Sequence, residues 1–497
     1  MDVVPIPLIG ESKYSLTIKM TTPPVFEPYV LSPLDHLTLP VYLYPLFVFH
    51  VDSPNLAIPV LELAVSRLVN LLPFLAGNIT TSTQLKGKEN VLEVQPPTQR
   101  FLTDFPMLKI KHHRQCISPT TSGSNAKAGQ FLNENLFPIP SEMAAEALSP
   151  IFRIQANVMG DGLILCLAFH HMAIDGVGLV NVATALATCC RDSRAEIETL
   201  PTDPQREEHS RQLIFESGSV ANSTDNLEAE YGDSSWDFTS NPEYEEPISK
   251  IFTLDAGKIE RIKTECQLMV EKDTNMPNLR LTSNTIVTAI LWMCWIRAKH
   301  HSSDSTEKPN DAESTILTTA DVRGRIEPRL PTSYIGNALL AAKTSARIQD
   351  IRSTKAVDHT SHRSGHIDHC EIEQISRLAV SLQKSAESID SQYVSSVISH
   401  IISNDNWAAT PLPTEFVVSS IRAFKLYDLD FGPTLGSMRD FGLDYNRIPG
   451  LCWIKPARYN TKLAPWELII MLEPKFMSNF EFDGLINWLI VKDGPRL

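Results

Sequence analysis

The sequence has no excess of basic residues. Its 497 residues include 44 Lys and Arg against 58 Asp and Glu, which gives a formal net charge of −14 and a pI near 5.5. Phosphate backbones are bound by clustered Lys and Arg, and the chain contains no such cluster. The composition therefore argues against a nucleic-acid partner.

Long apolar runs and patterned cysteines are also missing. No stretch reaches the roughly 18 apolar residues that a membrane span needs, and the N-terminus has no basic segment followed by an apolar one. The eight cysteines show neither the density of a disulfide scaffold nor a repeated C-x-x-C pattern. We therefore expect a cytoplasmic protein that is neither exported nor inserted into a membrane, with reduced and mostly buried thiols.

What the chain contains is typical of a large globular protein. Hydrophobic residues make up 43% and charged residues 21%, and 34 prolines indicate many loops. At roughly 100–200 residues per domain, the length predicts two or three domains, or one pseudo-duplicated pair. We expect a chain that buries a sizeable core.

Strand and helix patterns alternate in both halves. Apolar spacing predicts helices over 54–72, from Gly176 onward, over 282–299 and near 375–389, and strands from near Ser314, in TEFVVSSIRAF and in WELIIMLE. Residues 149–169 predict a hairpin that turns at the GDG of 160–162 and whose second strand is apolar throughout. This alternation favours α/β or α+β layers over a bundle or a sandwich.

An acidic segment separates the two halves. Between Asp203 and Glu246 there are twelve acidic residues against two arginines, with few clustered apolar residues, so we expect a solvated crossover. The predicted organisation is an N-terminal domain over 1–202, an acidic crossover loop over 203–250 and a C-terminal domain over 251–497.

The chemistry-bearing pattern follows the apolar strand of the hairpin. The sequence HHMAIDG places His171 at the strand's end, Asp175 four residues later and Gly176 where the next helix begins. A histidine projecting from a strand end into a cleft can act as a general base, and a nearby carboxylate can fix its loop. On this spacing alone, a hydrogen-bonded structural histidine is an equally good interpretation.

Several stretches together resemble one family. HHMAIDG is similar to the H-x-x-x-D-G signature of the coenzyme A-dependent acyltransferases called BAHD, and three further stretches agree with that family in order and spacing. These are LSPLDHL (31–37), TTADVRGRIEPRLPTSYIGNALL (318–340) and SSIRAFKLYDLDFG (419–432). LLPFLAGNI (71–79) also looks like that family's early helix-ending segment. The resemblance covers nearly the whole chain.

The resemblance implies a fold and an activity. It implies two similar chloramphenicol-acetyltransferase-like domains, each a mixed sheet flanked by helices, with a channel between them. It implies an enzyme that uses acyl-CoA as co-substrate and needs no metal, with His171 as general base and direct attack of the acceptor hydroxyl on the thioester. By family prevalence we expect a monomeric fungal O-acetyltransferase whose acceptor is a terpenoid, polyketide or alkaloid alcohol.

The resemblance also assigns roles to further residues. Ser419 is the candidate oxyanion donor, and Lys263 and Ser283 are the candidate coenzyme A contacts. Asp175 is expected to point away from substrate and to pair with Arg323, Arg325 or Arg329, while Asp430 of the DFG stretch is expected to pair with an arginine in its own region. Gly176 and Gly432 complete the structural motifs.

The chain departs from the family's usual pattern after Ser419. Ile421 stands where the family usually has Trp, and the family's D-F-G-W-G is here Asp430-Phe-Gly-Pro433-Thr-Leu-Gly436. These departures resemble a fungal rather than a plant member, and they affect the local shape of the channel.

A histidine-rich stretch invites a second interpretation. His359, His362, His366 and His369 lie close to Asp368 and Cys370, a set of zinc-ligand types. The surrounding sequence has almost no apolar residues to build a rigid shell around a metal, so a solvated loop is favoured over a metal site.

Three other functions remain open on the sequence. HHMAIDG also matches condensation domains, which take thioesters from a carrier protein, although no carrier or adenylation segment accompanies it. The fold can also serve as a binding or scaffolding protein without turnover. The same base can also drive an isomerisation or cyclisation without an acyl donor.

Overall fold

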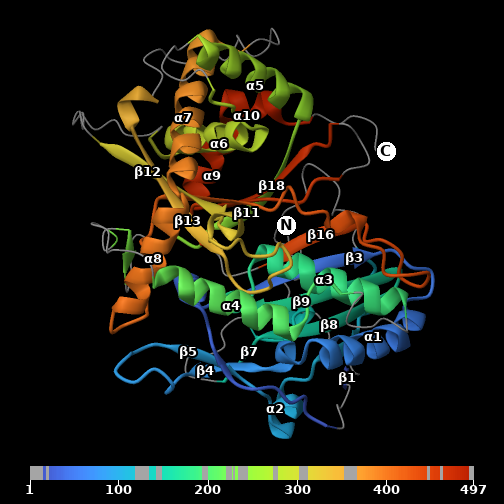
Figure 1. Cartoon of the computed structure of the whole chain (residues 1–497). Coiled ribbons are helices and arrows are strands. Elements are labelled where there is room, and N and C mark those ends of the chain that lie inside the picture. The colour runs from blue at the N-terminus through green and yellow to red at the C-terminus, as the bar shows by residue number, and fades with distance from the viewer. Residues whose placement is uncertain are drawn as a thin grey trace.

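The structure is a computed structural model of the whole chain, and it describes most of it (Figure 1). The described residues are 15–17, 22–117, 134–140, 148–192, 200–219, 227, 230–232, 245–272, 278–300, 312–351, 367–444, 448–458 and 463–491.

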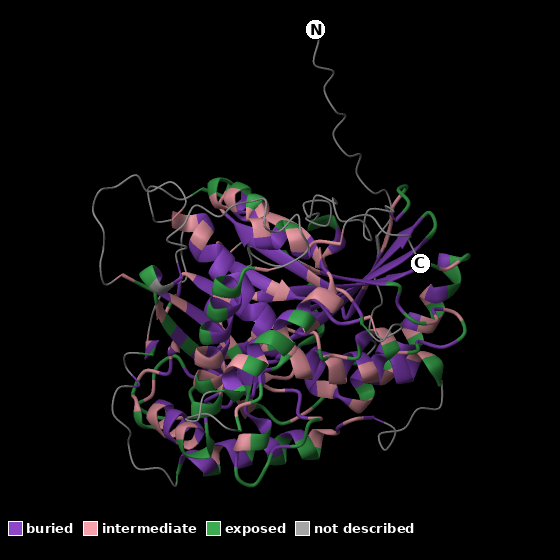
Figure 2. Ribbon diagram, turned by 90° about the horizontal axis from the view of Figure 1, so that it is seen from above, coloured by how far each residue is buried: buried purple, intermediate pink, exposed green. Residues whose placement is uncertain are grey.

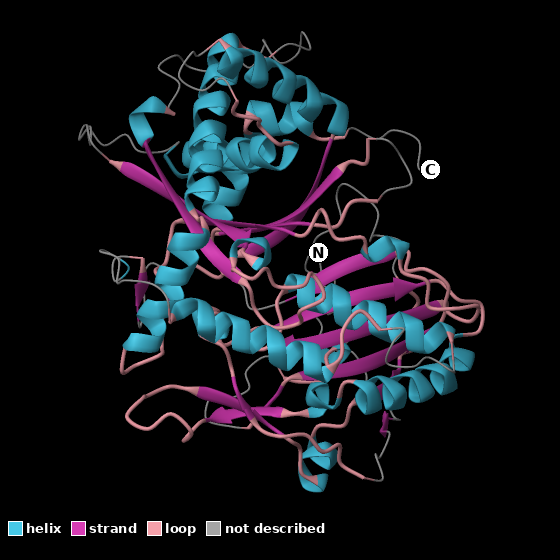
Figure 3. Ribbon diagram, in the orientation of Figure 1, coloured by secondary structure: helices cyan, strands magenta, loops and turns pink. Residues whose placement is uncertain are grey.

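A mixed six-stranded sheet organises the first half (Figures 1 and 3). Its order is β1 (Ser15–Thr17), β6 (Leu108–His112), β8 (Phe152–Met159), β9 (Gly162–His170), β3 (Tyr42–Phe49) and β16 (Asp440–Asp444). Helices α1 (Ala57–Leu71) and α3 (Gly176–Arg191) pack against each other and join its core. Strands β8 and β9 form the predicted hairpin, and β9 is buried along its whole length.

A second mixed six-stranded sheet organises the other half. Its order is β11 (Ile248–Leu254), β18 (Trp466–Leu472), β17 (Leu451–Ile454), β15 (Phe416–Ser420), β12 (Glu313–Asp321) and β13 (Leu339–Arg347). Helices α5 (Ala256–Glu271), α6 (Ser283–His300), α7 (His369–Ser388), α9 (Pro474–Phe482) and α10 (Gly484–Leu489) share one core with it. These helices lie together above the sheet in Figure 1.

The two faces of the second sheet differ in what covers them. Phe416 and Val418 of β15 belong to the core shared with the helices, whereas Leu451, Ile469 and Met471 pack into the core of the first half. Because side chains alternate along a strand, one face of this sheet meets helices and the other meets the first half.

Shorter elements complete the fold. A small sheet contains β2 (Tyr29–Val30), β5 (Leu92–Gln95), β4 (Asn78–Thr81) and β7 (Ser149–Pro150), and β10 (Tyr231–Gly232) pairs with β14 (Thr410–Pro411). The remaining helices are α2 (Gln99–Asp104), α4 (Pro204–Gly218) and α8 (Ser391–Ser403). Buried residues fill the sheets and the inner helix faces, while exposed ones lie on the outside (Figure 2).

These observations confirm the predicted fold class of two mixed sheets flanked by helices. The halves do not divide cleanly at residue 251, however, because β16 leaves the second half and pairs with β3 of the first sheet. Its Asp440 is buried and forms ion pairs with Lys455 and Arg458 of the second half. Within the described part of the chain, no helix is both long and apolar enough to cross a membrane.

The crossover contains a helix where we expected a solvated loop. Asp203 caps α4 by accepting hydrogen bonds from the amides of Gln205 and Arg206, and Pro204 occupies its first turn, as both residue types favour. The helix packs on α8 and buries Leu213 and Ile214. The loop prediction is therefore wrong for Pro204–Gly218, because the acidic content hid a narrow apolar face.

Glu207 of α4 links this helix to the second half. Its carboxylate accepts hydrogen bonds from the Thr202 hydroxyl at 2.8 Å and from the Ile335 amide at 3.1 and 3.2 Å. Burial raises the pKa of Glu207 from 4.5 to about 7. The two hydrogen-bond donors and the charges of Arg211 and Arg323 act in the opposite direction and lower this pKa, but their effect is smaller.

This raised pKa predicts a pH-dependent stability. The folded protein holds the Glu207 proton more tightly than the unfolded chain, so this group's contribution is lost as pH rises from about 4.5 to about 7. A glutamine at position 207 does not titrate, so Glu207→Gln does not lose this stability. The melting temperature of the variant minus that of wild type should therefore increase as pH rises from about 4.5 to about 7. Thermal melts of both proteins at each pH test this, and a constant difference would contradict it.

Candidate active site

His171 is the first residue after β9, and both its backbone N–H and its backbone carbonyl form hydrogen bonds. Its backbone N–H donates to the Val41 carbonyl at 2.9 Å. Its carbonyl accepts from Asn337 Nδ2 at 2.9 Å and from Thr38 Oγ1 at 3.4 Å. The imidazole is half-buried and lines a cavity of about 150 Å³, here named the His171 cavity.

Asn337 and Asp35 form a buried bridge behind His171. One Asp35 carboxylate oxygen accepts from the Asn337 backbone N–H at 2.8 Å and from its Nδ2 at 2.9 Å. The other accepts from the Ser32 amide and hydroxyl at 2.7 and 2.8 Å. The LSPLDHL and YIGN stretches thus meet at the His171 peptide, a contact that sequence order alone did not predict.

Asp175 lies behind His171 and pairs with Arg323. Both guanidinium Nη atoms lie 2.9 Å from its carboxylate oxygens, and the amides of Gly178 and Ala338 donate to it at 2.8 and 3.1 Å. Asp175 is fully buried and Arg323 is 2% exposed. Of the three arginines expected as partners, Arg323 is the one found.

The other candidate arginines lie elsewhere. Arg325 donates to the carbonyls of Ala386 and Ile389 near the end of α7, and Arg329 is exposed. Arg325 therefore fixes a helix end and has no contact with Asp175.

Two glycines allow a close fit where α3 begins. A Cβ on Gly176 would lie 2.9 Å from the Phe424 ring, and a Cβ on Gly178 would lie 1.9 Å from the Ile335 carbonyl oxygen. The second clash is too close for any side chain, so Gly178 is required where the YIGN stretch crosses the helix. Sequence analysis identified Gly176 but not Gly178.

Burial keeps the His171 imidazole neutral. Loss of solvation lowers the pKa of His171 below its ordinary value of 6.5, and the nearby Asp175 carboxylate opposes this shift. A neutral imidazole is the form that accepts a proton. The site therefore holds a base in its working state near neutral pH.

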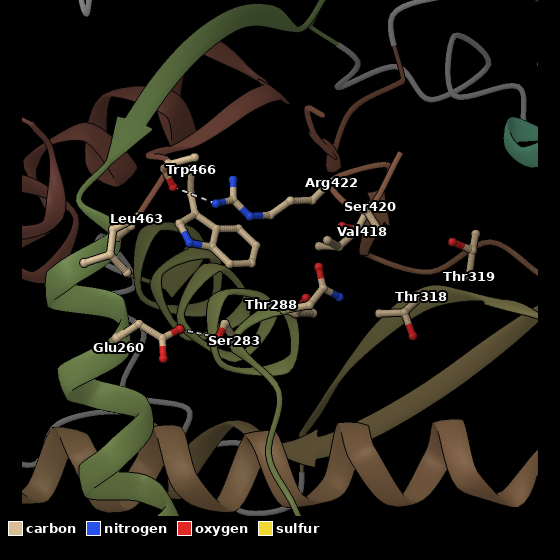
Figure 4. A pocket seen from close by; sticks show the side chains of 14 residues that line it. Glu260, Ser283, Thr288, Thr318, Thr319, Val418, Ser420, Arg422, Leu463 and Trp466 are labelled. Atoms are coloured by element: carbon tan, nitrogen blue, oxygen red, sulfur yellow. Dashed lines mark hydrogen bonds between the residues drawn. The ribbon is translucent and has the colours of Figure 1, made fainter. Parts of the chain in front are cut away.

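A second, larger cavity lies on the helix side of the second sheet (Figure 4). It has a volume of about 500 Å³, and its walls come from α5, α6, β12, β15 and the segment before β18. Val418 and Ser420 of β15 line this cavity, whereas Val417 and Ser419 line the His171 cavity. The two cavities thus lie on opposite faces of one sheet.

Ser419 lies where the sequence placed it, in the cavity of the histidine. It occupies the C-terminal part of β15 and is half-buried. Most of the other lining residues are apolar, including Leu39, Leu43, Leu339 and Trp453. A serine hydroxyl in such a setting can donate to a developing negative charge.

Lys263 and Ser283 come together at the rim of the larger cavity. Lys263 Nζ lies 3.1 Å from Ser283 Oγ and 3.3 Å from a Glu260 carboxylate oxygen, and Ser283 also donates to Glu260. Ser283 and Glu260 line the cavity, where Figure 4 shows their hydrogen bond. The sequence paired Lys263 with Ser283 but missed Glu260.

Asp430 differs from its predicted role. It is exposed, and its carboxylate accepts from the Gly432 amide at 2.9 Å, while Arg191 donates at 3.3 Å to its backbone carbonyl. The expected carboxylate–arginine pair is therefore not what fixes this turn. Gly432 has φ +85° and its Cβ would lie 2.9 Å from the Arg191 Cα, so glycine is needed there.

The histidine-rich stretch is only partly described. His359, His362 and His366 lie outside the described residues, whereas Asp368 caps α7 by accepting from the Cys370 amide at 3.1 Å. Within the described ranges no group of three or more His, Cys, Asp or Glu side chains could hold a metal ion.

The Asp175–Arg323 pair yields a stability prediction. Asp175→Asn removes one charge of a buried pair, which typically costs about 3–5 kcal/mol. The matched control Asp430→Asn changes an exposed carboxylate and should change stability by less than about 0.5 kcal/mol. Urea unfolding of both variants measures this, and equal losses would contradict the structural assignment.

Family models match most of the chain. A model described as the Transferase family matches residues 132–484, and a model of the trichothecene 3-O-acetyltransferase-like N-terminal domain matches residues 42–190. The communesin N16 acyltransferase of Penicillium expansum is 30% identical over 482 residues, which cover 94% of this chain and 98% of that protein. The fumigaclavine B O-acetyltransferase of Aspergillus fumigatus is 28% identical over 500 residues, with the same coverage of 94% and 98%.

Solved structures share the fold at low identity. TRI101 of F. sporotrichioides, complexed with coenzyme A and T-2, superposes with a TM-score of 0.70 at 15% identity, over 93% of this chain and 98% of that one. Vinorine synthase gives a TM-score of 0.62 at 15% identity, over 97% and 98%. Because the family model spans well over half of the sequence, the chain belongs to the Transferase family and is an enzyme of the BAHD acyltransferase type that its motifs predicted.

Proposed function

We propose that this enzyme transfers an acyl group, by default acetyl, from acyl-CoA to a hydroxyl of a small lipophilic specialised metabolite. The observation that carries the proposal is the position of His171. A half-buried imidazole with a lowered pKa lines a small apolar cavity. A larger cavity lies across the sheet, and at its rim Lys263 is paired with Glu260 beside Ser283. One cavity suits an alcohol and the other a thioester on a long, charged carrier.

The relatives support the acetyl group and the metabolite acceptor. Several are named O-acetyltransferases from fungi, and two are named for fumigaclavine B. Three neighbouring TRI101 structures contain coenzyme A together with T-2 or deoxynivalenol. We infer the same kind of donor here, and a monomeric enzyme acting in the cytoplasm.

The proposed reaction is a direct transfer. The neutral His171 imidazole removes the proton of the acceptor hydroxyl, and the alkoxide forms a bond to the thioester carbonyl carbon. The carbonyl electrons move to oxygen, where the Ser419 hydroxyl donates a hydrogen bond. Collapse of this intermediate breaks the carbon–sulfur bond, and the leaving coenzyme A thiolate takes the proton from His171.

Each substrate is assigned to one cavity. The phosphates of coenzyme A lie near Lys263 and Ser283 at the start of α6, a helix end that favours anions. The acceptor lies in the His171 cavity, among Leu39, Leu43 and Trp453. No carboxylate is among that cavity's described lining residues, which favours an uncharged acceptor surface.

Mutation of His171 tests the function. His171→Ala should reduce acetyl transfer from acetyl-CoA to a lipophilic alcohol by at least about 1,000-fold, because no other base lines the described part of the cavity. Release of the coenzyme A thiol measures the rate. His170→Ala is the matched control at the adjacent position. His170 is buried against Tyr42, and its loss should affect stability more than chemistry.

Other outcomes separate the alternatives. Product formation without acyl-CoA would support an isomerase or cyclase, and transfer only from a phosphopantetheinylated carrier would support the condensation reaction. Unchanged turnover in His171→Ala would remove the proposed mechanism.

The lowered pKa of His171 also predicts a pH profile. Because the imidazole stays neutral down to below its ordinary pKa, kcat should fall on the acid side only below about pH 6.5.

Glu260 yields a prediction for donor binding. Its carboxylate accepts hydrogen bonds from Lys263 and Ser283, the two donors that we assign to a coenzyme A phosphate. Glu260→Gln should therefore lower the KM for acetyl-CoA severalfold, and Lys263→Met should raise it, with kcat little changed. Lys272→Met, an exposed change at the end of the same helix, is the control. If instead the KM for acetyl-CoA rises in Glu260→Gln and falls in Lys263→Met, the coenzyme A phosphates do not bind at these residues.

A further inference from the structure

Thr319 is exposed although it lies on an inner strand of a sheet. It belongs to β12, which has β13 on one side and β15 on the other. Helices cover one face of this sheet and the first half of the chain covers the other. An exposed side chain there needs an opening beside it.

The strand pairing locates this opening. The parallel ladder between β12 and β15 runs from Ile316–Phe416 to Thr318–Val418 and stops there. On its other side, β12 stays paired with β13 through Asp321. The sheet is therefore open between β12 and β15 from Thr319 and Ser419 onward.

Thr319 lines both cavities, whereas its neighbours line one. Leu317 and Ser419 line only the His171 cavity, and Thr318 and Val418 line only the larger cavity. Figure 4 shows Thr318 and Thr319 beside each other at the larger cavity. Thr319 thus marks the place where the two cavities meet through the gap in the sheet.

The hydroxyls of Thr319 and Ser419 are both available for a ligand. Neither hydroxyl has a hydrogen bond to another residue of the described chain, whereas Thr318 Oγ1 donates to the Ala342 carbonyl at 3.4 Å. The two residues follow the last paired positions of neighbouring parallel strands. Two free donors therefore flank one opening.

We propose that Thr319 is a second oxyanion donor, acting beside Ser419. This inference rests on the proposed acyl transfer, because an acyl donor and an alcohol that arrive from opposite faces must react where the cavities join. The thioester carbonyl then lies in the gap, within reach of hydroxyls from both strands. When the alkoxide bonds to the carbonyl carbon, the carbonyl oxygen gains the electron pair, and both hydroxyls donate to it without losing their protons.

Sequence patterns gave no signal for this role. Threonine is a common strand residue because its β-branched side chain suits the pleated surface. The TTAD sequence of residues 318–321 is therefore typical of any strand. The role follows from the end of the ladder, which a single sequence does not reveal.

The test is a set of matched substitutions assayed with acetyl-CoA and an accepted alcohol. Thr319→Val keeps the shape and removes the hydroxyl, and it should lower kcat by about 10-fold to 100-fold with little change in the KM for acetyl-CoA. Thr319→Ser should restore most of the rate. Thr315→Val, on the same strand but outside both cavities, should match wild type.

A double-mutant comparison separates catalysis from structure. If both hydroxyls bind one oxyanion, the rate losses of Thr319→Val and Ser419→Ala should not simply multiply in the double variant. Wild-type kcat in Thr319→Val, or a rise in KM alone, would overturn the inference. If wild type itself transfers no acyl group from acetyl-CoA, the proposed function fails instead, so the two failures are distinguishable.

Discussion

The carboxylate of Asp175 is the contact on which the site depends. It lies at the start of α3 in the first half, and it accepts from the α3 amide of Gly178 and from Arg323 and Ala338 of the second half. Four N–H donors around one buried charge compensate its loss of water. Because these donors come from both halves, the same contact fixes the loop after His171 and joins the two sheets.

A second bridge acts on the His171 peptide itself. Asp35 and Asn337 hold its carbonyl, and Val41 holds its N–H. The imidazole is thus placed by its backbone, and burial lowers its pKa. The second sheet has one cavity on each face, and its opening between β12 and β15 lies where the two cavities meet.

Local patterns predicted much of this arrangement, and long-range contacts explain the rest. The β8–β9 hairpin, α3 and the meeting of His171 with Ser419 in one cavity follow from periodicity and from the family resemblance. Arg323 and Arg325 lie in the same short turn and contact different elements, and Asp430 meets Arg191 of α3 through its backbone carbonyl and not through its carboxylate. Neither contact can be read from a single sequence. Helix α4 was missed because it contains few apolar residues in a strongly acidic segment, although Leu213 and Ile214 share a buried face.

In the proposed reaction, donor and acceptor meet at the gap in the second sheet beside His171. A crystal structure of the protein with coenzyme A tests this most directly. The pantetheine arm should lie in the larger cavity, with its thiol between β12 and β15 and facing the His171 imidazole. Coenzyme A bound outside the larger cavity, or with its thiol turned away from that gap, would contradict a reaction at this opening.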